Sequence, residues 1–573
     1  MVKISEKNKM ISSRISKLKK YFLDHQIDGY VIPKNNEFFS EYDQLDRLKK
    51  ISNFSGSAGL AIITKKNNYL FVDGRYTIQA KNQSGKQFKI FDIASNPPSK
   101  ILKNIKLGLD PKIFTKKSVE RFFSKKIKYK LVEDNLIDKI QKNKIKKNKE
   151  FFSLPAKTTG ETKNSKINKV ANFLKKTKTD YLFVTAPENV AWVLNIRGED
   201  NPNSPIPNSH LIITKNKKIL LFADKNKVKN ILKNNTINKS QFAQVEEIKS
   251  YLDKLDKKTF VIDSNTCSLF YENLIQKKFK ILREEDPIYA FKAIKNSTEI
   301  NHMIDCHNED GLALTRFIYW IKHNRKKINE VDAEKKLENF RKKSKKYLYP
   351  SFNTIAGTGK NGAIVHYRAN PKNCRWLNKK EIFLFDSGGQ YKYGTTDVTR
   401  TICFEKPDLK IKDAFTRVLK GHIAVYQSNL KKYDIGKKID VRARKYLKEK
   451  GLDYAHGTGH GVGFFLNVHE GPQSISKFNK VKLKEGMIIS NEPGYYLEKE
   501  FGIRIENLVY IKKKGKDLKF ENLTYAPIDT DLINFSLLNK SEKNYLFKYH
   551  LDIYSRYSKY LNKKEKNWLA SLI

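Results

Sequence analysis

The sequence EIFLFDSGGQYKYGTTDVTRT occupies residues 381–401 and decides how the second half of the chain folds. Its apolar run, Ile382 to Phe385, is typical of a buried strand and ends on Asp386. A Ser-Gly-Gly turn follows, and an alternating run that contains Asp397 returns as a second strand. Pairing of these strands would bring the two aspartates side by side. Two adjacent buried carboxylates repel each other unless a proton or a metal ion lies between them.

Three of the eleven histidines lie close together, in and just after the glycine-rich stretch HGTGHGVG at 456–463. They are His456, His460 and His469. A lone histidine is more often a packed or surface residue than a ligand. The glycines between these histidines, however, allow the main chain to approach a ligand closely. We therefore expect this stretch to form one side of a site.

Two glutamates complete a candidate ligand set. Glu492 ends the apolar run that begins at Ile488, and Glu506 lies in the apolar alternation 501–507. Each acid alone could be an ordinary residue at a strand end. Together, two aspartates, two glutamates and one histidine supply enough ligands for two divalent cations. The oxygen-rich set suits Mn, Mg or Co, and Zn is possible.

Two other motifs do not predict the sites that they resemble. GTGKNG at 357–362 matches the dinucleotide-binding pattern, but the next residues, AIVHY at 363–367, indicate a strand where that site needs a helix. We expect a glycine-rich loop there. The pair His469-Glu470 is followed by Gly-Pro-Gln, which disfavours the helix of a zinc-binding H-E-x-x-H motif.

The first half of the chain contains an internal repeat. In each copy a Lys-rich amphipathic stretch precedes one β-rich run, and a hairpin-like pair of β-rich runs follows. We expect two copies of one α/β unit, in residues 1–150 and 151–290, with a Lys/Asn-rich linker at 142–149. The β-rich runs are 27–33, 60–65 and 69–73 in the first copy, and 179–184, 211–215 and 219–224 in the second.

The remaining residues, 291–573, form a third predicted domain. Apolar residues at helical spacing predict a helix over 297–323. Short strand-like runs rich in Gly, His, Asp and Glu extend from about 347 to 512. A tail from about 525 ends in a segment rich in Tyr and Leu, 537–573, which we expect to be helical.

The composition excludes several other classes of protein. The net charge of +52 comes from 113 Lys plus Arg against 61 Asp plus Glu, and would ordinarily indicate nucleic acid or an anionic membrane as partner. Lysine greatly outnumbers arginine, however, and the excess runs along the whole chain beside abundant Asn and Ile. We interpret it as generic solvated surface, and expect no specific nucleic-acid partner.

Cysteine usage and hydropathy favour the cytoplasm. The four cysteines are far apart and form no C-x-x-C pair, which argues against disulfides and a cysteine zinc site. The apolar runs are far shorter than the roughly 18 residues of a membrane span. The basic N-terminus has no apolar segment of the signal-peptide kind. We expect a cytoplasmic protein with no membrane partner.

The candidate ligands and their neighbours resemble the metal-ligand series of the pita-bread metallopeptidases, the M24 family. This family includes methionine aminopeptidase, prolidase and aminopeptidase P. The flanking stretches HGTGHG (456–461), NEPGYY (491–496) and GIRIEN (502–507) are also similar. Two N-terminal α/β units resemble the long, cytosolic aminopeptidase P type, and the resemblance extends to YAPI at 525–528. The matching metal ligands are Asp386, Asp397, His460, Glu492 and Glu506.

The resemblance implies an α/β (α+β) architecture of two creatinase-like domains followed by a pita-bread catalytic domain. It implies hydrolysis of X-Pro peptides at the bond before proline, by a hydroxide that bridges two metal ions. Mn is the metal expected, with Zn or Co possible, and the protein would be a homodimer. Asp386 and Glu506 would bridge the metals, Asp397 would hold one, and His460 with Glu492 the other. Glu492 would also carry a proton to the leaving proline nitrogen.

The resemblance also implies roles for residues around the metals. His469 would stabilise the tetrahedral oxyanion and contact the substrate. His366 and His456 would line the proline side, although His366 could instead be an ordinary strand histidine. Arg504 would support a metal ligand. Arg75, in Asp-Gly-Arg-Tyr, resembles a substrate-contacting arginine. The second repeat has Asp-Lys-Asn at the equivalent place, so the fold of the repeat does not require an arginine.

Three alternatives stay open. Prolidase, which cleaves X-Pro dipeptides, would need one N-terminal unit where this chain has two. Methionine aminopeptidase has no need of about 290 preceding residues. A non-catalytic pita-bread module that binds peptides, histones or RNA would have lost metal ligands, and all five stand in this sequence.

Overall fold

The computed structural model describes residues 2–41, 45–123, 126–141, 149–372 and 374–573. The chain divides into two compact units, Met1–Tyr289 and Ala290–Ile573. All but the last residue of the predicted linker at 142–149 lies outside the described residues. No described helix is both long enough and apolar enough to cross a membrane.

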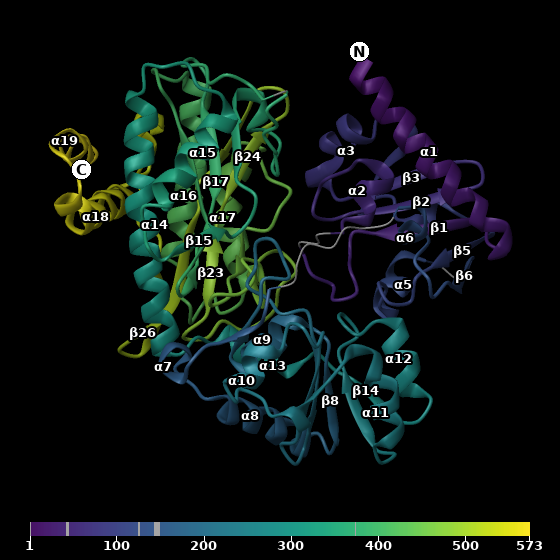
Figure 1. Ribbon diagram of the computed structural model, residues 1–573. Helices are drawn as coiled ribbons and strands as arrows, with labels where there is room; N and C mark the ends of the chain where they lie inside the picture. Colours follow the sequence, from purple (N-terminus) through teal and green to yellow (C-terminus); the bar gives the residue numbers. More distant parts are fainter. Residues whose placement is uncertain (1, 42–44, 124–125, 142–148, 373) are drawn as a thin grey trace. The chain divides into compact units, whose positions relative to one another are not determined.

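The first unit contains two six-stranded sheets of identical topology, which confirms the predicted repeat (Figure 1). Their strand orders are β4-β3-β2-β1-β5-β6 and β12-β11-β10-β8-β13-β14. In each sheet the three predicted runs form an antiparallel meander, whose first strand also pairs in parallel with a later strand. The strands are β1 (Gly29–Pro33), β2 (Leu60–Thr64), β3 (Asn68–Val72), β4 (Lys89–Asp92), β5 (Ile105–Leu109), β6 (Ile127–Leu131), β8 (Tyr181–Val184), β10 (His210–Thr214), β11 (Ile219–Phe222), β12 (Phe242–Ala243), β13 (Thr259–Ile262) and β14 (Lys280–Arg283).

The central strands of these sheets are buried along their whole length, which explains why they are almost continuously apolar, whereas edge strands such as β6 and β14 are partly exposed. In the first sheet, Tyr30 and Ile32 pack with α1 (Val2–Asp24), whereas Val31 belongs to the core on the opposite face. In the second sheet, Phe183 belongs to a core that includes residues of α12 (Leu269–Gln276). Two covered sheets therefore account for the hydrophobic residues of the first unit.

The second unit begins with α14 (Ser297–His323), as predicted. The helix starts where it does because Asn296 and Glu299 form a capping box, in which each side chain accepts from the other's backbone N–H. With α15 (Glu330–Arg341), it covers a sheet of β16 (Ile355–Thr358), β17 (Phe383–Ser387) and β20 (Val398–Ile402). Leu314 and Phe317 of α14 pack against Phe385 in this core.

A second helix pair covers a second sheet (Figure 1). Helices α16 (Leu409–Tyr426) and α17 (Gly436–Lys448) contribute to a core with the strands of a five-stranded sheet, β22-β21-β23-β26-β27. A separate two-stranded ribbon joins β24 to β25. These strands are β21 (Gly459–Gly461), β22 (Glu470–Ile475), β23 (Ile488–Asn491), β24 (Gly494–Leu497), β25 (Phe501–Arg504), β26 (Asn507–Lys514) and β27 (Asp517–Asn522).

The stretch 381–401 folds as two antiparallel strands, as predicted. β17 pairs with β20 so that Asp386 lies opposite Thr399. The connection is longer than the sequence suggested, because residues 389–395 form a small hairpin of their own, β18 (Gly389–Tyr391) and β19 (Gly394–Thr395). Asp397 lies in the short connection between that hairpin and β20.

The strand predicted over 363–367 is wrong. After β16 the chain enters a 3₁₀ turn, η5 (Gly359–Asn361), and residues 362–366 continue as turns and a bend. Gly359 has φ +51°, and a Cβ at Gly357 would lie 2.8 Å from the nitrogen of Gly362. The glycines therefore fold the chain back on itself, and the expected glycine-rich loop is present without a strand after it.

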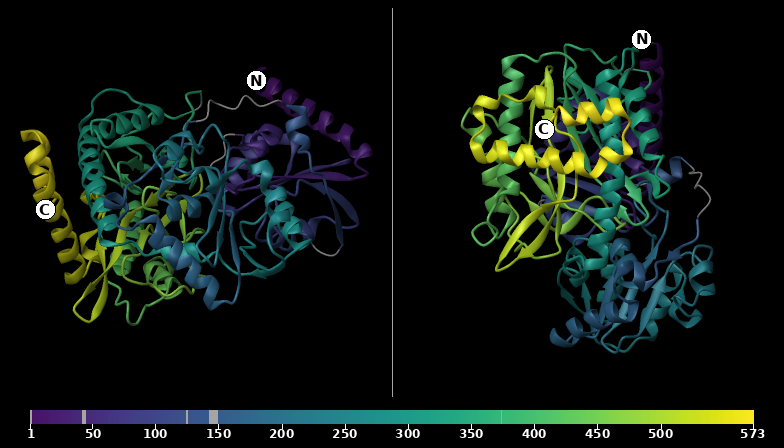
Figure 2. Two further views of the ribbon diagram at one scale, coloured as in Figure 1. Left: turned by 60° about the horizontal axis from the view of Figure 1, so that its bottom comes forward. Right: turned by 90° about the vertical axis from the view of Figure 1, so that its left-hand side faces the viewer.

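The helical tail is present as α18 (Lys540–Tyr557) and α19 (Lys563–Ala570). Helix α18 packs against α16, and α19 against α14 (Figure 2). The chain passes close to α14 at Gly311, where an added Cβ would lie 2.1 Å from the hydroxyl of Tyr557 and 2.4 Å from the carbonyl of Tyr525. The missing side chain at Gly311 thus makes room for the tail.

Substitution of Gly311 by alanine should destabilise the second unit by about 1–3 kcal/mol, because the new methyl group overlaps Tyr525 and Tyr557. Alanine favours an isolated helix by about 1 kcal/mol over glycine, so the packing effect has the opposite sign to helix propensity. Urea unfolding measures the change. Asn301→Ala, on the exposed surface of the same helix, is the control and should be nearly neutral. Equal or greater stability of Gly311→Ala would contradict this packing.

Candidate metal centre

The five predicted metal ligands come from strand ends in both sheets of the second unit. Asp386 lies in β17 and Asp397 directly before β20, whereas His460 lies in β21 and Glu492 directly after β23. Glu506 lies between β25 and β26, and its backbone N–H donates to the carbonyl of Thr399 in β20. This hydrogen bond joins the two halves of the unit at the centre of the ligand set.

The ligand atoms form overlapping groups, in each of which all atoms lie within 4.8 Å of one another. One group is Asp386, Asp397 and Glu506, and a second is His460, Glu492 and Glu506. The Nε2 atom of His460 lies 3.4 Å from Asp397 Oδ2 and 3.5 Å from Glu492 Oε1. Glu506 belongs to both groups, so its carboxylate is placed to contact two ions at once.

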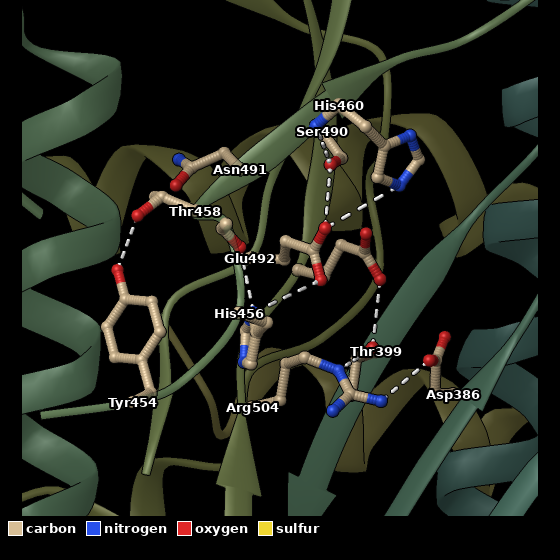
Figure 3. A network of polar contacts seen from close by, with 12 residues as sticks. Asp386, Thr399, Tyr454, His456, Thr458, His460, Ser490, Asn491, Glu492 and Arg504 are labelled. Carbon is tan, nitrogen blue, oxygen red and sulfur yellow. Dashed lines mark hydrogen bonds and ion pairs between the residues drawn. The ribbon is translucent and has the colours of Figure 1, made fainter. Parts of the chain in front are cut away.

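His460 is oriented by its neighbours (Figure 3). Its Nδ1–H donates to the carbonyl of Gly461 at 2.9 Å, and its backbone N–H donates to Ser490 Oγ at 3.0 Å. The Nδ1 bond assigns a proton to that nitrogen and leaves Nε2, which faces the carboxylates, as the atom that would bind a cation in the neutral ring. This is the arrangement that a metal-binding histidine requires.

The electrostatics of the cluster indicate a deficit of positive charge. Burial raises the pKa of Asp386 to about 6, against the opposing effect of Arg504 and with added repulsion from Asp397. Burial also raises the pKa of Glu492, and burial together with neighbouring carboxylates raises the pKa of Glu506 well above its ordinary value. For His460, burial alone would lower the pKa, but the hydrogen bond to Asp397 and the charge of Glu492 raise it to about 9.

The donor set fits divalent cations. Asp386 Oδ1 is buried and, among the described residues, has no hydrogen-bond partner. A buried carboxylate oxygen left in this way is costly unless it binds a cation. Cations bound here would favour the ionised carboxylates and the neutral imidazole, which reverses each of the pKa shifts described above. One neutral nitrogen and several carboxylate oxygens suit hard or borderline divalent ions.

Arg504 links the ligands to one another and to the surrounding side chains (Figure 3). Its Nη2 lies 2.7 Å from Asp386 Oδ2, and its Nε donates to Thr399 Oγ1 at 3.0 Å. Thr399 Oγ1 in turn donates to Glu506 Oε2 at 2.8 Å. Arg504 Nη1 donates to the hydroxyl of Tyr496 at 2.6 Å. One guanidinium thus contacts a predicted ligand directly and reaches another through Thr399.

Thr399 and Tyr496 are functional neighbours that the sequence analysis did not single out. Thr399 follows Asp397 by two residues in an extended segment, so strand alternation could have indicated that both face the site. Tyr496 had no comparable signal. Its hydroxyl lies 2.9 Å from His456 Nε2, and because His456 Nδ1–H donates to the carbonyl of Gly457, Nε2 accepts from the tyrosine.

The remaining predicted site residues lie in different places. His469 contacts His460 edge to face, with 4.4 Å between ring centroids, and forms a third group with Asp397 and His460. His456 Nδ1 lies 4.0 Å from Glu492 Oε2. His366, half-buried in the turn after η5, belongs to none of the groups formed by the described residues. Arg75 lies in η1 (Gly74–Tyr76) of the first unit, and its side chain is outside the described part.

A second acidic cluster does not need a metal. Cys403, Asp529 and Asp531 also bring ligand atoms within 4.8 Å of one another. The ammonium group of Lys322, however, lies 2.6 Å from Asp529 Oδ1 and 2.8 Å from Asp531 Oδ2. A lysine thus already supplies the positive charge, whereas the cluster around Glu506 has several carboxylates for the guanidinium of Arg504.

A cluster of carboxylates around one histidine defines a class, the proteins with a centre for divalent metal ions. Comparison with known families narrows this class. Residues 301–513 match metallopeptidase family M24, and 516–572 match the C-terminal region of that peptidase. Residues 14–138 and 141–299 each match the creatinase/prolidase N-terminal domain. The chain belongs to metallopeptidase family M24, with two creatinase-type domains ahead of a pita-bread domain, as predicted.

Relatives match along the whole length of the chain. A probable Xaa-Pro aminopeptidase P of Laccaria bicolor is 36% identical, over 96% of this chain and 90% of its own. Xaa-Pro aminopeptidase 1 of Dictyostelium discoideum is 36% identical, over 98% and 96%. The crystal structure of the X-prolyl aminopeptidase from Caenorhabditis elegans, a cytosolic enzyme with a di-nuclear active site, has a TM-score of 0.91 and 28% identity, covering 98% of this chain and 99% of that one. A prolidase of Pyrococcus horikoshii, 25% identical with a TM-score of 0.51, covers 64% of this chain and 99% of its own.

Titration of the metal-free protein with MnCl₂ in a calorimeter should show two sites per chain. Asp397→Asn should weaken at least one of them by about tenfold or more, because it removes a charged ligand atom. Asp531→Asn, in the lysine-paired cluster, is the matched control and should leave both sites unchanged. Loss of a site in the control but not in Asp397→Asn would place the metal elsewhere.

Proposed function

We propose that this chain is a metal-dependent aminopeptidase that hydrolyses the bond between an N-terminal residue and a following proline. Full-length similarity to Xaa-Pro aminopeptidases is the observation that carries the proposal. The convergence of all five predicted ligands supports it independently. The substrate is a peptide with proline in second position.

The proposed ligand assignment is the one that the family resemblance implies, and the groups of the cluster support it for Glu506, which belongs to two of them. Asp386, Asp397, His460, Glu492 and Glu506 would hold two divalent cations, with Asp386 and Glu506 shared between the two, Asp397 on one, and His460 with Glu492 on the other. Two cations bound there would supply Lewis-acid polarisation of the scissile carbonyl and would make water nucleophilic near neutral pH. The oxygen-rich ligand set supports Mn as the metal, with Zn or Co as alternatives.

Glu492 is the proposed proton carrier. Ser490 Oγ donates to its Oε1 at 3.2 Å, which fixes the carboxylate, and Oε2 faces His456. The leaving nitrogen of proline has no N–H in the substrate and must gain a proton as the bond breaks. A carboxylate beside the reacting carbonyl can take a proton from the attacking water and give it to that nitrogen.

The histidines have separate proposed roles. His469, beside His460, donates a hydrogen bond to the developing oxyanion. Because both ring nitrogens of His456 are hydrogen-bonded, His456 lines the proline side with its ring. We propose the same lining role for His366, and a substrate contact for Arg75. Arg504 supports Asp386 through their ion pair.

Three further features complete the proposal: the domain boundaries, the cellular location and the oligomeric state. Domain boundaries at 150 and 290 agree with the two sheets of the first unit and with the division of the chain after Tyr289. A cytoplasmic location is supported by the described residues, which contain no membrane-spanning helix, and by the cytosolic relative. We propose a homodimer by analogy with the family. Sedimentation equilibrium would test this oligomeric state.

Hydrolysis of X-Pro-Y, X-Pro and X-Ala-Y peptides by Mn-loaded protein tests the substrate class. The expected result is cleavage of X-Pro-Y alone, abolished by EDTA. Cleavage of X-Pro but not X-Pro-Y would instead identify a prolidase. The prolidase structure covers only 64% of this chain, which argues against that alternative. Asp386→Ala should lower kcat/KM at least about a thousandfold, since a lost ligand removes several kcal/mol of transition-state stabilisation. Unchanged activity of that variant would refute the metal assignment.

His469→Ala should lower kcat for X-Pro-Y by about 10²–10³-fold while two Mn ions still bind, because an oxyanion donor acts in the transition state. Calorimetry distinguishes this role from metal ligation, which the proximity of His469 to Asp397 and His460 would also allow. Weaker Mn binding by the variant would show that His469 is a ligand instead. His323→Ala, an exposed histidine at the end of α14, is the control.

A non-catalytic module that binds nucleic acid is the alternative from another class. The charge of +52 would then produce an association that weakens steeply with salt. Absence of binding to single strands or duplexes at physiological salt excludes it.

A further inference from the structure

A buried arginine outside the cluster connects a proposed ligand with the C-terminal helices. Arg400 lies in β20, three residues after Asp397, and is only 1% exposed. It forms no ion pair with any described residue. Its guanidinium donates instead to carbonyl, amide and hydroxyl oxygens. A buried guanidinium that donates hydrogen bonds to several backbone segments holds those segments in fixed relative positions.

On one side, Arg400 holds Glu506. Its Nη1 donates to the carbonyl oxygen of Glu506 at 2.6 Å and to that of Thr399 at 2.8 Å. The backbone N–H of Glu506 donates to the Thr399 carbonyl at 3.1 Å, and Thr399 Oγ1 binds the Glu506 carboxylate at 2.8 Å. Two consecutive residues therefore fix Glu506 at its N–H, its carbonyl and its carboxylate.

On the other side, Arg400 holds the tail. Its Nε donates to the carbonyl of Pro527 at 3.0 Å, and its Nη2 donates to that of Ala526 at 2.8 Å. The same Nη2 donates to the hydroxyl of Tyr549, in α18, at 2.9 Å. Tyr549 is 2% exposed, and its hydroxyl lies 3.1 Å from the Ala526 carbonyl, to which it donates. Removal of this hydroxyl would leave Arg400 Nη2 with the oxygens of Asn507 and Ala526, and would take away the acceptor that lies 3.2 Å from the buried N–H of Ala526. An unpaired N–H at Ala526 would disturb the tail segment whose carbonyl groups Arg400 binds.

We propose that Tyr549 is a positioning residue for Glu506, the carboxylate that contacts both metal ions, and that it acts through Arg400. The C-terminal helix α18 is then part of the structure that holds the metal centre in place. Tyr549 touches neither metal nor substrate. The inference rests on the proposed metal site.

Tyr549→Phe removes only the hydroxyl and keeps the ring between Tyr525 and Tyr545, whose centroids each lie 6.0 Å away. Calorimetric titration with Mn should show binding weakened by roughly 3–10-fold, somewhat less than the 10–100-fold typical of a group that contacts a ligand directly. Tyr545→Phe is the matched control, because the hydroxyl of Tyr545 lies 3.5 Å from Asn522 and does not contact Arg400. Its Mn affinity should equal that of the wild type.

A double-variant cycle tests the path through Arg400. Arg400→Lys keeps the charge but cannot bind Glu506, Asn507 and Tyr549 together, so Tyr549→Phe should have little further effect on Mn affinity in that background. Additive effects would overturn the proposal. So would a Tyr549→Phe protein that unfolds at a lower temperature yet binds Mn like the wild type, since that describes a purely structural residue.

Hydrogen exchange on the wild-type chain keeps the test independent of variant folding. Coupling is reciprocal, so Mn binding should slow exchange of the α18 amides around Tyr549, but not of α10 (Lys229–Lys233) in the first unit. Unchanged exchange in α18 would overturn the proposal. A wild-type chain that binds no Mn would refute the metal site itself, whereas a failure confined to Tyr549 leaves that site standing.

Discussion

Mutual repulsion among the four carboxylates of the cluster, of which three are buried and that of Glu492 is half-buried, is the interaction on which the second unit depends. Each buried charge costs several kcal/mol unless it is paired, and the ligand atoms of these carboxylates form overlapping groups, in each of which they lie within 4.8 Å of one another. Arg504 pairs with Asp386, while Thr399 and Ser490 donate to the two glutamates. These contacts orient the carboxylates but do not neutralise them. Without cations the raised pKa values of Asp386, Glu492 and Glu506 show the repulsion, and cations bound among the carboxylates would remove it.

The carboxylates are held close together because the site lies where two sheets meet, each of them covered by a helix pair. One helix pair and one sheet bring Asp386 and Asp397 together, and the other pair and sheet bring His460 and Glu492. Glu506 belongs to the second half by sequence, yet it is held by Thr399 and Arg400 of the first. Because each half is packed around its own core, the ligands are placed by rigid strands and not by loops alone.

Features that depend on local pattern could be predicted from the sequence, and features that depend on distant contacts could not. The helix at 297–323 and the duplicated β-rich runs follow from periodicity, and the ligand set from acids beside apolar strands. The prediction of a strand at 363–367 was wrong because the preceding glycines let the chain turn back on itself. Arg400 and Tyr549 are separated by 149 residues, so no spacing in the sequence indicates their hydrogen bond.

The composition bears on the same conclusion. Basic residues outnumber acidic ones by 113 to 61. A charged side chain at an average position of this chain is therefore more often cationic than anionic. The cluster reverses this bias, with four carboxylates and one contacting guanidinium among its described residues. Surface lysines are screened over about 10 Å at ordinary ionic strength and cannot neutralise a buried centre. Charge has to be supplied locally, and two dications would balance four carboxylates. The excess of +52 therefore describes the surface of this protein, whereas the acids that run against it describe its chemistry.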